Sequence, residues 1–299
     1  MPQRKGVRPP MKTLGGKSQL LDPLIEVLDY SVEEYDLTGI CDLFLGGNRI
    51  HTHYEHPYIE FRLGNEIDRG VLALHRCLQD PDKVEDLLDQ IQLIDDPNII
   101  NAEVFETFKQ EIDTTIDEVA AAAMTYVVTE YSRAADRQTF CQENVNRGIK
   151  IDKVALKFYA LEGVYEDVIY TNDDYEFSFD KYKHRDDYLF ILDPPYVETD
   201  ANGKTKETKA YKHKFNLERQ EGLVDNLLKD DLKAKVILCG YPNDIYDRLT
   251  DSNGFYCYFI GMVHVASSST GRKRPEFIWT NFPIPEYALP TAPFDIDEE

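Results

Sequence analysis

The residues best suited to chemistry are Asp193, Pro194, Pro195 and Tyr196, which directly follow the apolar run 189–192. The Asp193 carboxylate and the Pro194 carbonyl can accept the two N–H bonds of an exocyclic amine. Two successive prolines restrict the backbone, so the direction of the Pro194 carbonyl is fixed. Tyr196 can stack on a base that has left its helix. Because such contacts favour a tetrahedral nitrogen whose lone pair faces an electrophile, they predict methylation of an exocyclic amine.

A turn that only ends a buried strand is the alternative for this tetrapeptide, since Pro cannot continue a central strand and Asp is common at such ends. With usages of about 5% or less per residue type, the tetrapeptide arises by chance in about a few chains per thousand of this length. In open α/β sheets, ligands bind at the carboxyl ends of strands, where this segment is expected. We therefore predict a functional role.

A second group of residues suits a methyl donor such as S-adenosylmethionine, which offers a carboxylate, an ammonium, a ribose diol and an adenine. Gly46 and Gly47 follow the predicted strand 40–45, and glycines there let the backbone approach a ligand closely. Glu66 stands twenty residues after Gly46, at the end of the next predicted strand. Its carboxylate can accept hydrogen bonds from a ribose diol. A plain surface turn and a surface acid are the alternative.

Lys17 follows Gly15 and Gly16 at the start of a predicted helix over residues 18–30. Its charge and the helix dipole can together hold the donor carboxylate. A solvated lysine in a first helical turn is the alternative. No Gly stands five residues before Gly16, so the spacing disfavours a P-loop and nucleotide triphosphate binding.

Metal binding and a disulfide framework are both disfavoured by the sequence. His51, His53 and His56 lie close together, but no carboxylate or Cys pattern accompanies them, so we predict no metal. The five cysteines are odd in number and form no Cys-x-x-Cys pair, which predicts reduced, buried thiols in a cytoplasm. No apolar signal core or membrane-spanning run is present, so we predict a cytoplasmic protein with no membrane partner.

The net charge of −22 over 299 residues contrasts with the basic surfaces that usually bind nucleic acid. Positive charge is nevertheless concentrated in three segments. Residues 1–17 carry five basic side chains and no acid, residues 201–216 carry five lysines and one glutamate, and residues 272–274 read Arg-Lys-Arg. These segments adjoin the residues predicted to carry the chemistry, which favours a basic surface around the site for a polyanionic substrate. Ordinary solvated loops are the alternative.

The hydrophobic pattern predicts an α/β fold with buried strands and amphipathic helices. Two aromatic-rich runs, 255–265 and 276–282, predict an antiparallel hairpin. Residues 82–163 read as helical, and residues 82–118 contain twelve acids and two lysines. The predicted strands are 40–45, 58–63, 164–170, 188–192 and 235–239, and the predicted helices outside the insertion are 18–30, 71–78 and 223–228, the last capped by Asn216.

With these residues identified, the chain resembles the Dam-like DNA N6-adenine methyltransferases, the D12 class, alpha group. Residues 15–17 are similar to the N-terminal lysine motif of that family, and residues 42–46 to its donor loop. Residues 66–68 occupy the place of its Asp-Ile-Asn, and residues 193–196 form an intact catalytic motif. Asn48 stands where the donor loop has its final glycine; because Asn tolerates positive φ, the turn can be kept.

The resemblance implies a Rossmann-like S-adenosylmethionine-dependent methyltransferase sheet with a C-terminal antiparallel hairpin and a helical insertion. We expect a donor-binding part at 1–80, a target-recognition insertion at 81–163, a catalytic part at 164–285 and an acidic tail at 286–299. Catalysis is assigned to residues 193–196. Donor binding is assigned to Lys17, Asp42, Phe44, Gly46, Gly47, Glu66, Asp174 and Asp193, and DNA binding to Lys209, Lys212, Arg272, Lys273 and Arg274.

The resemblance therefore implies a site-specific enzyme that methylates the N6 amine of a flipped adenine in double-stranded DNA, as in restriction-modification systems of bacteria, phages or mobile elements. N4-methylation of cytosine is an alternative, because the same acceptors fit any exocyclic amine. A weak or inactive methyltransferase fold with a binding or regulatory role is another. In that case the acidic helices would dock a basic protein partner, although a solvated acidic face is the commoner explanation of such a run.

Overall fold

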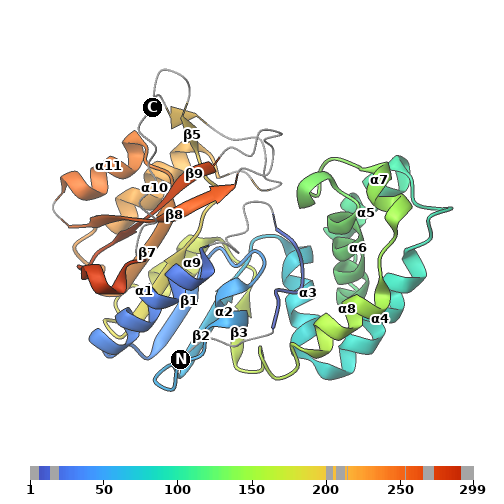
Figure 1. Cartoon of the computed structure of the whole chain (residues 1–299), viewed down its shortest axis with the longest axis horizontal. Helices are drawn as coiled ribbons and strands as arrows, with labels where there is room; N and C mark the ends of the chain where they lie inside the picture. Colours follow the sequence, from blue (N-terminus) through green and yellow to red (C-terminus); the bar gives the residue numbers. More distant parts are fainter. Residues whose placement is uncertain are drawn as a thin grey trace.

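The computed structural model describes residues 7–13, 20–199, 205–206, 213, 215–252, 254–264 and 273–290. Within these residues, a sheet of seven strands has the order β3-β2-β1-β4-β7-β9-β8 (Figure 1). Its first five strands in this order are parallel, whereas β9 is antiparallel to β7 and to β8. The strands are β1 (Gly39–Asp42), β2 (Phe61–Asn65), β3 (Val168–Thr171), β4 (Tyr188–Leu192), β7 (Lys235–Gly240), β8 (Tyr256–His264) and β9 (Lys273–Thr280).

Helices cover both faces of this sheet. One hydrophobic cluster joins the sheet to α1 (Leu21–Glu34), and another joins it to α9 (Tyr175–Tyr182), α10 (Leu217–Leu227) and α11 (Asp244–Asp251). A short helix, α2 (Arg49–His53), follows β1, and a separate two-stranded ribbon consists of β5 (Glu198–Thr199) and β6 (Thr205–Lys206). The fold is therefore a three-layer structure, and its α/β class is the predicted one.

The central strand β4 shows why the chain forms such a layered sheet. All five of its residues are buried. Leu189 and Ile191 face the α1 layer, whereas Phe190 and Leu192 face the α9–α11 layer. A parallel strand that is buried on both faces requires this continuous apolar run.

Helices α4 to α8 form a lobe beside α3 (Arg69–Gln79), at the right of Figure 1. Their hydrophobic core includes Val71 and Leu74 of α3 and Val168 of β3, so the core is continuous across the predicted boundary at residue 80. The predicted insertion 81–163 contains the helices α4 (Pro81–Ile94), α5 (Ala102–Ile112), α6 (Glu118–Glu130), α7 (Gln142–Arg147) and α8 (Ile151–Tyr159), with η1 (Arg133–Ala135) between α6 and α7.

The sheet has a topological switch point between β1 and β4. The chain leaves β1 toward β2 and β3 on one side, and it leaves β4 toward β7 on the other. A crevice therefore opens beyond the carboxyl ends of these two neighbouring strands, where ligands bind in folds of this type.

Several element boundaries differ from the predicted ones. The strand predicted at 40–45 ends at Asp42, yet Leu43 N donates to Ile191 O and Leu45 N donates to Asn65 O, so the chain still runs between its neighbours. The strand predicted at 58–63 is displaced to Phe61–Asn65. Helices α9 and α11 were not predicted, because Asx caps rather than long apolar repeats define their starts: Asp174 and Asn243 accept backbone N–H groups there.

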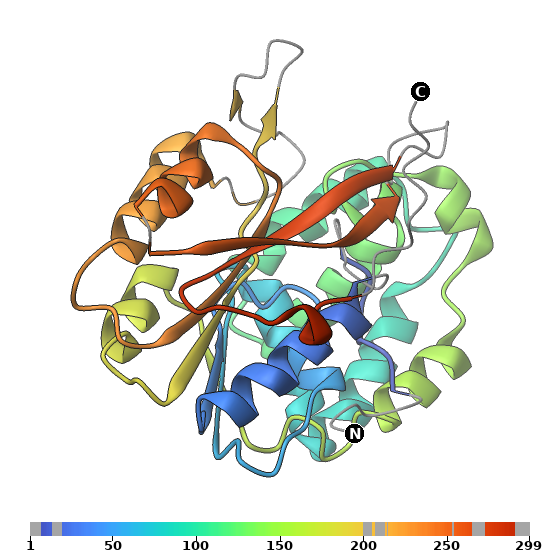
Figure 2. The ribbon, with the colours of Figure 1, turned by 60° about the vertical axis from the view of Figure 1, so that its left-hand side comes forward.

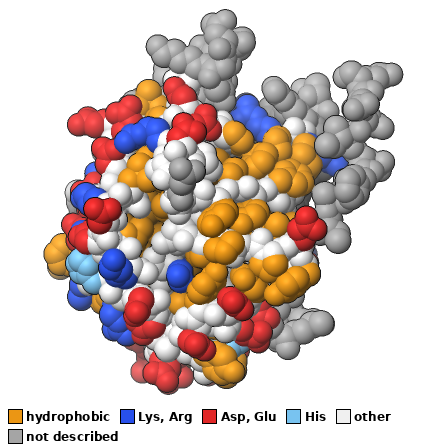
Figure 3. Space-filling view, turned by 90° about the vertical axis from the view of Figure 1, so that its left-hand side faces the viewer, with side chains coloured by type: hydrophobic (Ala, Val, Ile, Leu, Met, Phe, Trp, Pro, Cys, Tyr) orange, Lys and Arg blue, Asp and Glu red, His pale blue; other side chains and the backbone are white. Residues whose placement is uncertain are grey.

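The C-terminal segment packs against the α1 layer, where η2 (Glu286–Ala288) lies beside α1 (Figure 2). Ile284 and Ala288 are buried there, while residues 291–299 lie outside the described residues. Figure 3 shows hydrophobic side chains gathered on the side of the molecule that carries β8 and η2. Tyr256 and Tyr287 are exposed. The described part of the sheet ends at β8, so no further described strand pairs with the outer edge of β8.

The five cysteines are free, but they do not share one environment. Cys41, Cys77 and Cys239 are buried, as predicted. The prediction of buried thiols is wrong for Cys257, which is exposed because it lies on the terminal strand β8. Among the described residues, no helix has both the length and the apolar composition needed to cross a membrane.

We predict that Gly70→Ala destabilises the protein by about 1–3 kcal/mol through overpacking of α3 against the helical lobe. A Cβ at Gly70 would overlap the Thr125 hydroxyl and lie 2.5 Å from Ile112 Cγ2. The matched control is Gly222→Ala in α10, where the added carbon meets no atom within 4 Å. The control should gain about 0.5–1 kcal/mol from helix propensity. Urea unfolding measures both, and equal effects would contradict the close approach.

Candidate active site

A cavity of about 460 Å³ opens at the switch point, beyond the carboxyl ends of β1 and β4. This volume lies in the range typical of small-molecule sites, about 300–1,000 Å³. The loop after β1, the residues after β2, the start of α9 and the residues after β4 all line it. Of the predicted site residues, the structure brings together Asp42, Phe44, Gly46, Gly47, Glu66, Asp174, Asp193, Pro194, Pro195 and Tyr196.

The loop after β1 has the backbone of a tight turn. Gly46 has φ +48° and Asn48 has φ 55°, so both adopt the left-handed conformation. The prediction that Asn48 can keep the turn is confirmed, and its side chain also donates to the Tyr170 hydroxyl at 2.7 Å. Thr13 approaches Gly47 so closely that a Cβ there would lie 3.1 Å from its methyl carbon.

His75 of α3 supports this turn from below. Its Nε2 lies 2.8 Å from the Gly46 carbonyl and donates to it in the neutral tautomer. The side chain is fully buried, and burial lowers the pKa of His75 to about 4, with the Gly46 hydrogen bond opposing the shift. The ring is therefore neutral at physiological pH.

Glu66 closes the other side of the turn. Its Oε2 accepts from Gly46 N at 2.7 Å, and its Oε1 accepts from Asp68 N at 2.9 Å. Burial and then the charge of Asp68 raise the pKa of the Glu66 carboxyl, whereas these hydrogen bonds and the charge of Arg137 oppose the rise. Each carboxylate oxygen keeps a second lone pair for a ligand hydroxyl.

The segment that carries Asp174 is held beside Glu66 by two asparagines. Asn172 Nδ2 donates to the carbonyls of Glu66 and Ile67 at 2.5 and 3.1 Å. Asn65 Nδ2 donates to the Asp173 carbonyl at 3.0 Å, and Asn65 Oδ1 accepts from Asp173 N at 3.1 Å. The acids that the sequence assigns to donor binding on separate strands therefore meet at one edge of the sheet.

Aromatic rings form one wall of the cavity. Phe44, Tyr175 and Phe215 lie with ring centroids 5.3–5.5 Å apart. Arg219 lies over Tyr175 and Phe215, and its Nη2 is 2.7 Å from Asp174. Burial raises the pKa of the Asp174 carboxyl, but hydrogen bonds from Arg219 and from the α9 backbone outweigh it and hold the pKa below its usual range. This wall can receive a planar heterocycle.

The tetrapeptide 193–196 follows β4 directly and lies in the cavity wall. Its backbone is held by Gln220 of α10, a fully buried side chain whose Nε2 donates to the Pro195 carbonyl at 2.8 Å. Gln220 is fixed in turn because its Oε1 accepts from the Tyr246 hydroxyl at 2.7 Å. Two rigid prolines and this buried amide therefore define the direction of the backbone carbonyls.

Tyr196 reaches from the tetrapeptide toward the C-terminal hairpin. Its hydroxyl donates to the buried carboxylate of Glu276 on β9 at 3.1 Å, and its ring meets Tyr241 edge-on at 4.8 Å. Arg274 lies over Tyr241 at 5.5 Å. Of the residues predicted to bind DNA, Arg274 thus sits one side chain away from the tetrapeptide, and Lys273 is exposed on the same strand. Lys17, Lys209, Lys212 and Arg272 lie outside the described residues.

Sequence reasoning missed several residues of this site. Arg49 lines the cavity; burial lowers the pKa of its guanidinium, and the charge of Asp193 opposes the shift. Arg137, from the helical lobe, also lines the cavity and pairs with Asp68. Gln220 and His75 hold the loops of the cavity in place, and no local sequence motif marks either residue. Only Arg49 carries a sequence signal, because it directly follows the donor loop.

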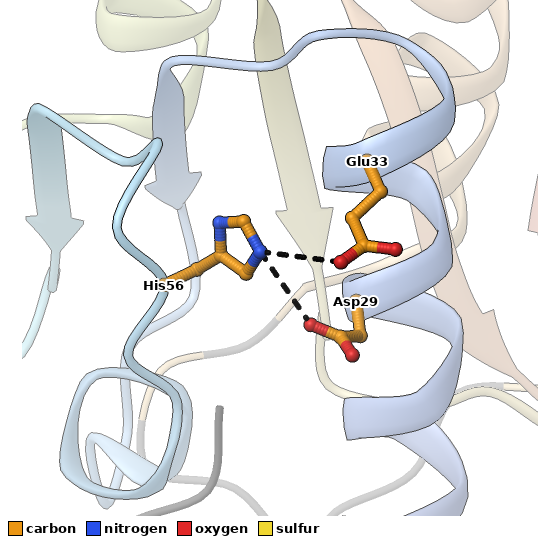
Figure 4. Close-up of side chains that lie close together, drawn as sticks. All are labelled: Asp29, Glu33 and His56. Carbon is orange, nitrogen blue, oxygen red and sulfur yellow. Dashed lines mark ion pairs between the residues drawn. The ribbon is translucent and has the colours of Figure 1, made fainter. Parts of the chain in front are cut away.

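The three histidines that suggested a metal cluster do not converge. His51 Nε2 contacts the Leu63 carbonyl, and His53 Nδ1 contacts the Arg49 carbonyl. His56 instead faces Asp29 and Glu33 of α1, with Nε2 3.8 Å from a carboxylate oxygen of each (Figure 4).

This group of Asp29, Glu33 and His56 has the residue types of a metal site, and it lies apart from the residues that line the cavity. His56 Nδ1 accepts from Tyr58 N at 3.2 Å, so in the neutral ring the proton is on Nε2. The nitrogen that faces the two acids is then an N–H donor. Ligation of a cation through Nε2 would require this proton to leave or to move to Nδ1.

A family model of D12 class N6 adenine-specific DNA methyltransferases matches residues 14–256. The chain belongs to this family. The match covers the donor loop, the helical lobe and the tetrapeptide, and it confirms the predicted fold class and activity: this methyltransferase methylates the N6 amine of adenine in DNA at specific sites. Membership also implies S-adenosylmethionine as the methyl donor. No curated protein matches the chain well enough to add a relative.

We predict that Gln220→Leu lowers kcat of the methyltransferase by about tenfold or more while the KM for the donor changes little. Losing the buried amide frees the Pro195 carbonyl, and small misplacements of positioning groups are costly to rate. Steady-state methylation kinetics measure the effect. Tyr246→Phe is the matched control, because it removes a hydrogen bond to Gln220 but leaves Gln220 itself, and its effect should be smaller. Equal kcat values for Gln220→Leu and the unchanged protein would contradict this role.

We also predict that His75 makes stability depend on pH. Its pKa is about 4 in the folded protein, so the unfolded chain binds the proton first as pH falls below about 6.5. The free energy of unfolding is therefore highest above pH 6.5 and falls as the pH drops toward 4. His75 alone lowers it by about 2 kcal/mol between pH 7 and pH 5. Urea unfolding at both pH values should show a smaller loss for His75→Gln. The same loss in both proteins would exclude this role.

Proposed function

We propose that residues 193–196 hold the target base and that the loop after β1 holds the donor. This proposal is based on one observation: a single cavity is lined both by Gly46 and Glu66 and by Asp193 and Tyr196. Asp193 and the Pro194 carbonyl accept the two amine N–H bonds and orient the nitrogen lone pair. Tyr196 stacks on the flipped adenine.

The residues of the cavity fit the chemistry of the donor. Backbone amides at Gly46 and Gly47 border the turn, Glu66 accepts from the ribose diol, and Asp174 borders the adenine beside the aromatic wall. Asp42 is buried at the base of the turn, where its Oδ1 accepts from Phe44 N at 3.3 Å. Lys17 is assigned to the donor carboxylate. When bound, the donor supplies a methyl group on a cationic sulfur, and acids around the cavity suit that charge.

We propose that the reaction needs no metal. The amine is oriented by the Asp193 carboxylate, the Pro194 carbonyl and the Tyr196 ring. The amine nitrogen would then attack the methyl carbon of the donor as the donor sulfur leaves. A general base is not required before transfer, because the proton leaves the nitrogen once the new bond gives it positive charge.

Double-stranded DNA is proposed to approach from the side of the basic segments. Lys209, Lys212, Arg272, Lys273 and Arg274 are assigned to phosphates, which makes affinity fall steeply with salt. The exposed position of Lys273 and the position of Arg274 over Tyr241, whose ring contacts Tyr196, support this face. A protein partner for the acidic helices 82–118 is a secondary proposal, supported by their charge alone.

We predict that the protein converts unmethylated genomic DNA to DNA containing N6-methyladenine when S-adenosylmethionine is added. Asp193→Ala should lower the rate by at least about a hundredfold, because one of the two amine acceptors is lost. Nucleoside mass spectrometry measures the product. The matched control is Asp186→Ala, an exposed acid at the opposite end of β4, which should retain full activity.

The same assay separates the alternatives. N4-methylcytosine as the product would replace the adenine assignment. Donor binding by calorimetry without product on varied DNA would favour a regulatory protein. Product formation that is unchanged in Asp193→Ala would remove the tetrapeptide from the mechanism.

A further inference from the structure

The loop between α6 and α7 has an unusual backbone. Ala134, Ala135 and Arg137 all have positive φ, at 52°, 59° and 54°, although none is glycine. An antiparallel bridge between Ser132 and Phe140 closes the loop at its base. Residues other than glycine adopt this backbone conformation rarely. Groups of such residues occur at functional sites, where surrounding contacts enforce the conformation.

The contacts that hold this loop lead into the cavity. Arg137 Nη1 lies 3.0 Å from Asp68 Oδ2, and the Asp68 side chain is 2% exposed. The other oxygen of Asp68 accepts from Gly70 N and Val71 N, so Asp68 also caps α3. Ser132 Oγ accepts from Arg137 N at 3.0 Å, which fixes the backbone of the arginine. Ala135, Asp136 and Arg137 line the cavity wall.

The ion pair lies next to the acid assigned to the donor ribose. Asp68 is two residues from Glu66, and its backbone N–H donates to Glu66 Oε1. Two carboxylates this close repel each other, and Arg137 supplies positive charge to the pair. His213 Nε2 is 3.2 Å from the same Asp68 oxygen and adds a second basic group.

We propose that Arg137 is a positioning residue of the donor pocket: its ion pair with Asp68 holds the 132–140 loop against the cavity and offsets the charge beside Glu66. The helical lobe thereby contributes to donor binding although it lies outside the Rossmann-like sheet. This inference rests on the proposed donor site. Arg137 acts through Asp68 and Glu66 and does not take part in methyl transfer.

Two substitutions test the pair without disturbing the local fold. Arg137→Asn removes the charge but tolerates positive φ, and Asp68→Asn removes the charge but keeps an oxygen that can cap α3. Calorimetry with S-adenosylmethionine should show binding about tenfold weaker for each, and kcat at saturating donor should stay within about twofold of the unchanged protein. Because the two side chains act on each other, the double variant should be no weaker than either single variant.

Two further variants separate positioning from a general effect of charge. Arg137→Lys keeps the positive charge and should recover most of the donor affinity. Arg133→Asn removes an exposed arginine from the same loop that does not line the cavity, and it should bind the donor normally. Thermal unfolding of each variant reports whether the fold is retained.

Normal donor affinity in Arg137→Asn would overturn the inference, as would additive losses in the double variant. Glu66→Ala tests the donor site itself. If Glu66→Ala abolishes binding while Arg137→Asn does not weaken it, only the inference fails. Absence of donor binding by the unchanged protein would overturn the donor site and the inference with it.

Discussion

The parallel pairing of β1 with β4 is the constraint on which the site depends. Asp42 pairs with Ile191, so the loop after β1 and residues 193–196 leave the sheet side by side. Chain connections diverge at this point, toward β2 on one side and toward β7 on the other, which leaves a crevice between them. The sequence separates the two segments by about half of the chain, but the hydrogen bonds of two buried strands join them.

Around this pairing, buried polar side chains fix loops that would otherwise be free. His75 holds the turn at Gly46, Asn65 holds the segment before α9, and Gln220 holds the Pro195 carbonyl. Each is buried or nearly so, and each satisfies a backbone group that faces the protein interior. The site is therefore preorganised by α3, α10 and the end of β2, because its own residues lie on loops.

The acidic character of the chain is compatible with DNA as the substrate because charge is distributed unevenly. The acids of residues 82–118 belong to the outer lobe, whereas Arg274 of β9 lies over Tyr241, whose ring contacts Tyr196. Arg137 shows that the lobe also reaches the cavity, where it pairs with Asp68. An insertion placed between β2 and β3 can reach the cavity, since β2 itself ends there.

The sequence by itself determined the α/β fold class and the order along the chain of the segments that line the cavity. The apolar run 189–192 and residues 193–196 predicted the catalytic turn, and Gly46 with Glu66 predicted the donor side, since these signals are local and periodic. Asn216 and Asn243 show the limit of such signals: only the first was recognised as a cap, because an apolar helix followed it clearly. The tertiary structure alone decided which distant side chains support the site. Gln220, His75 and Arg137 reach it by packing between helices and loops, and no local pattern encodes a contact between residues so far apart in the chain.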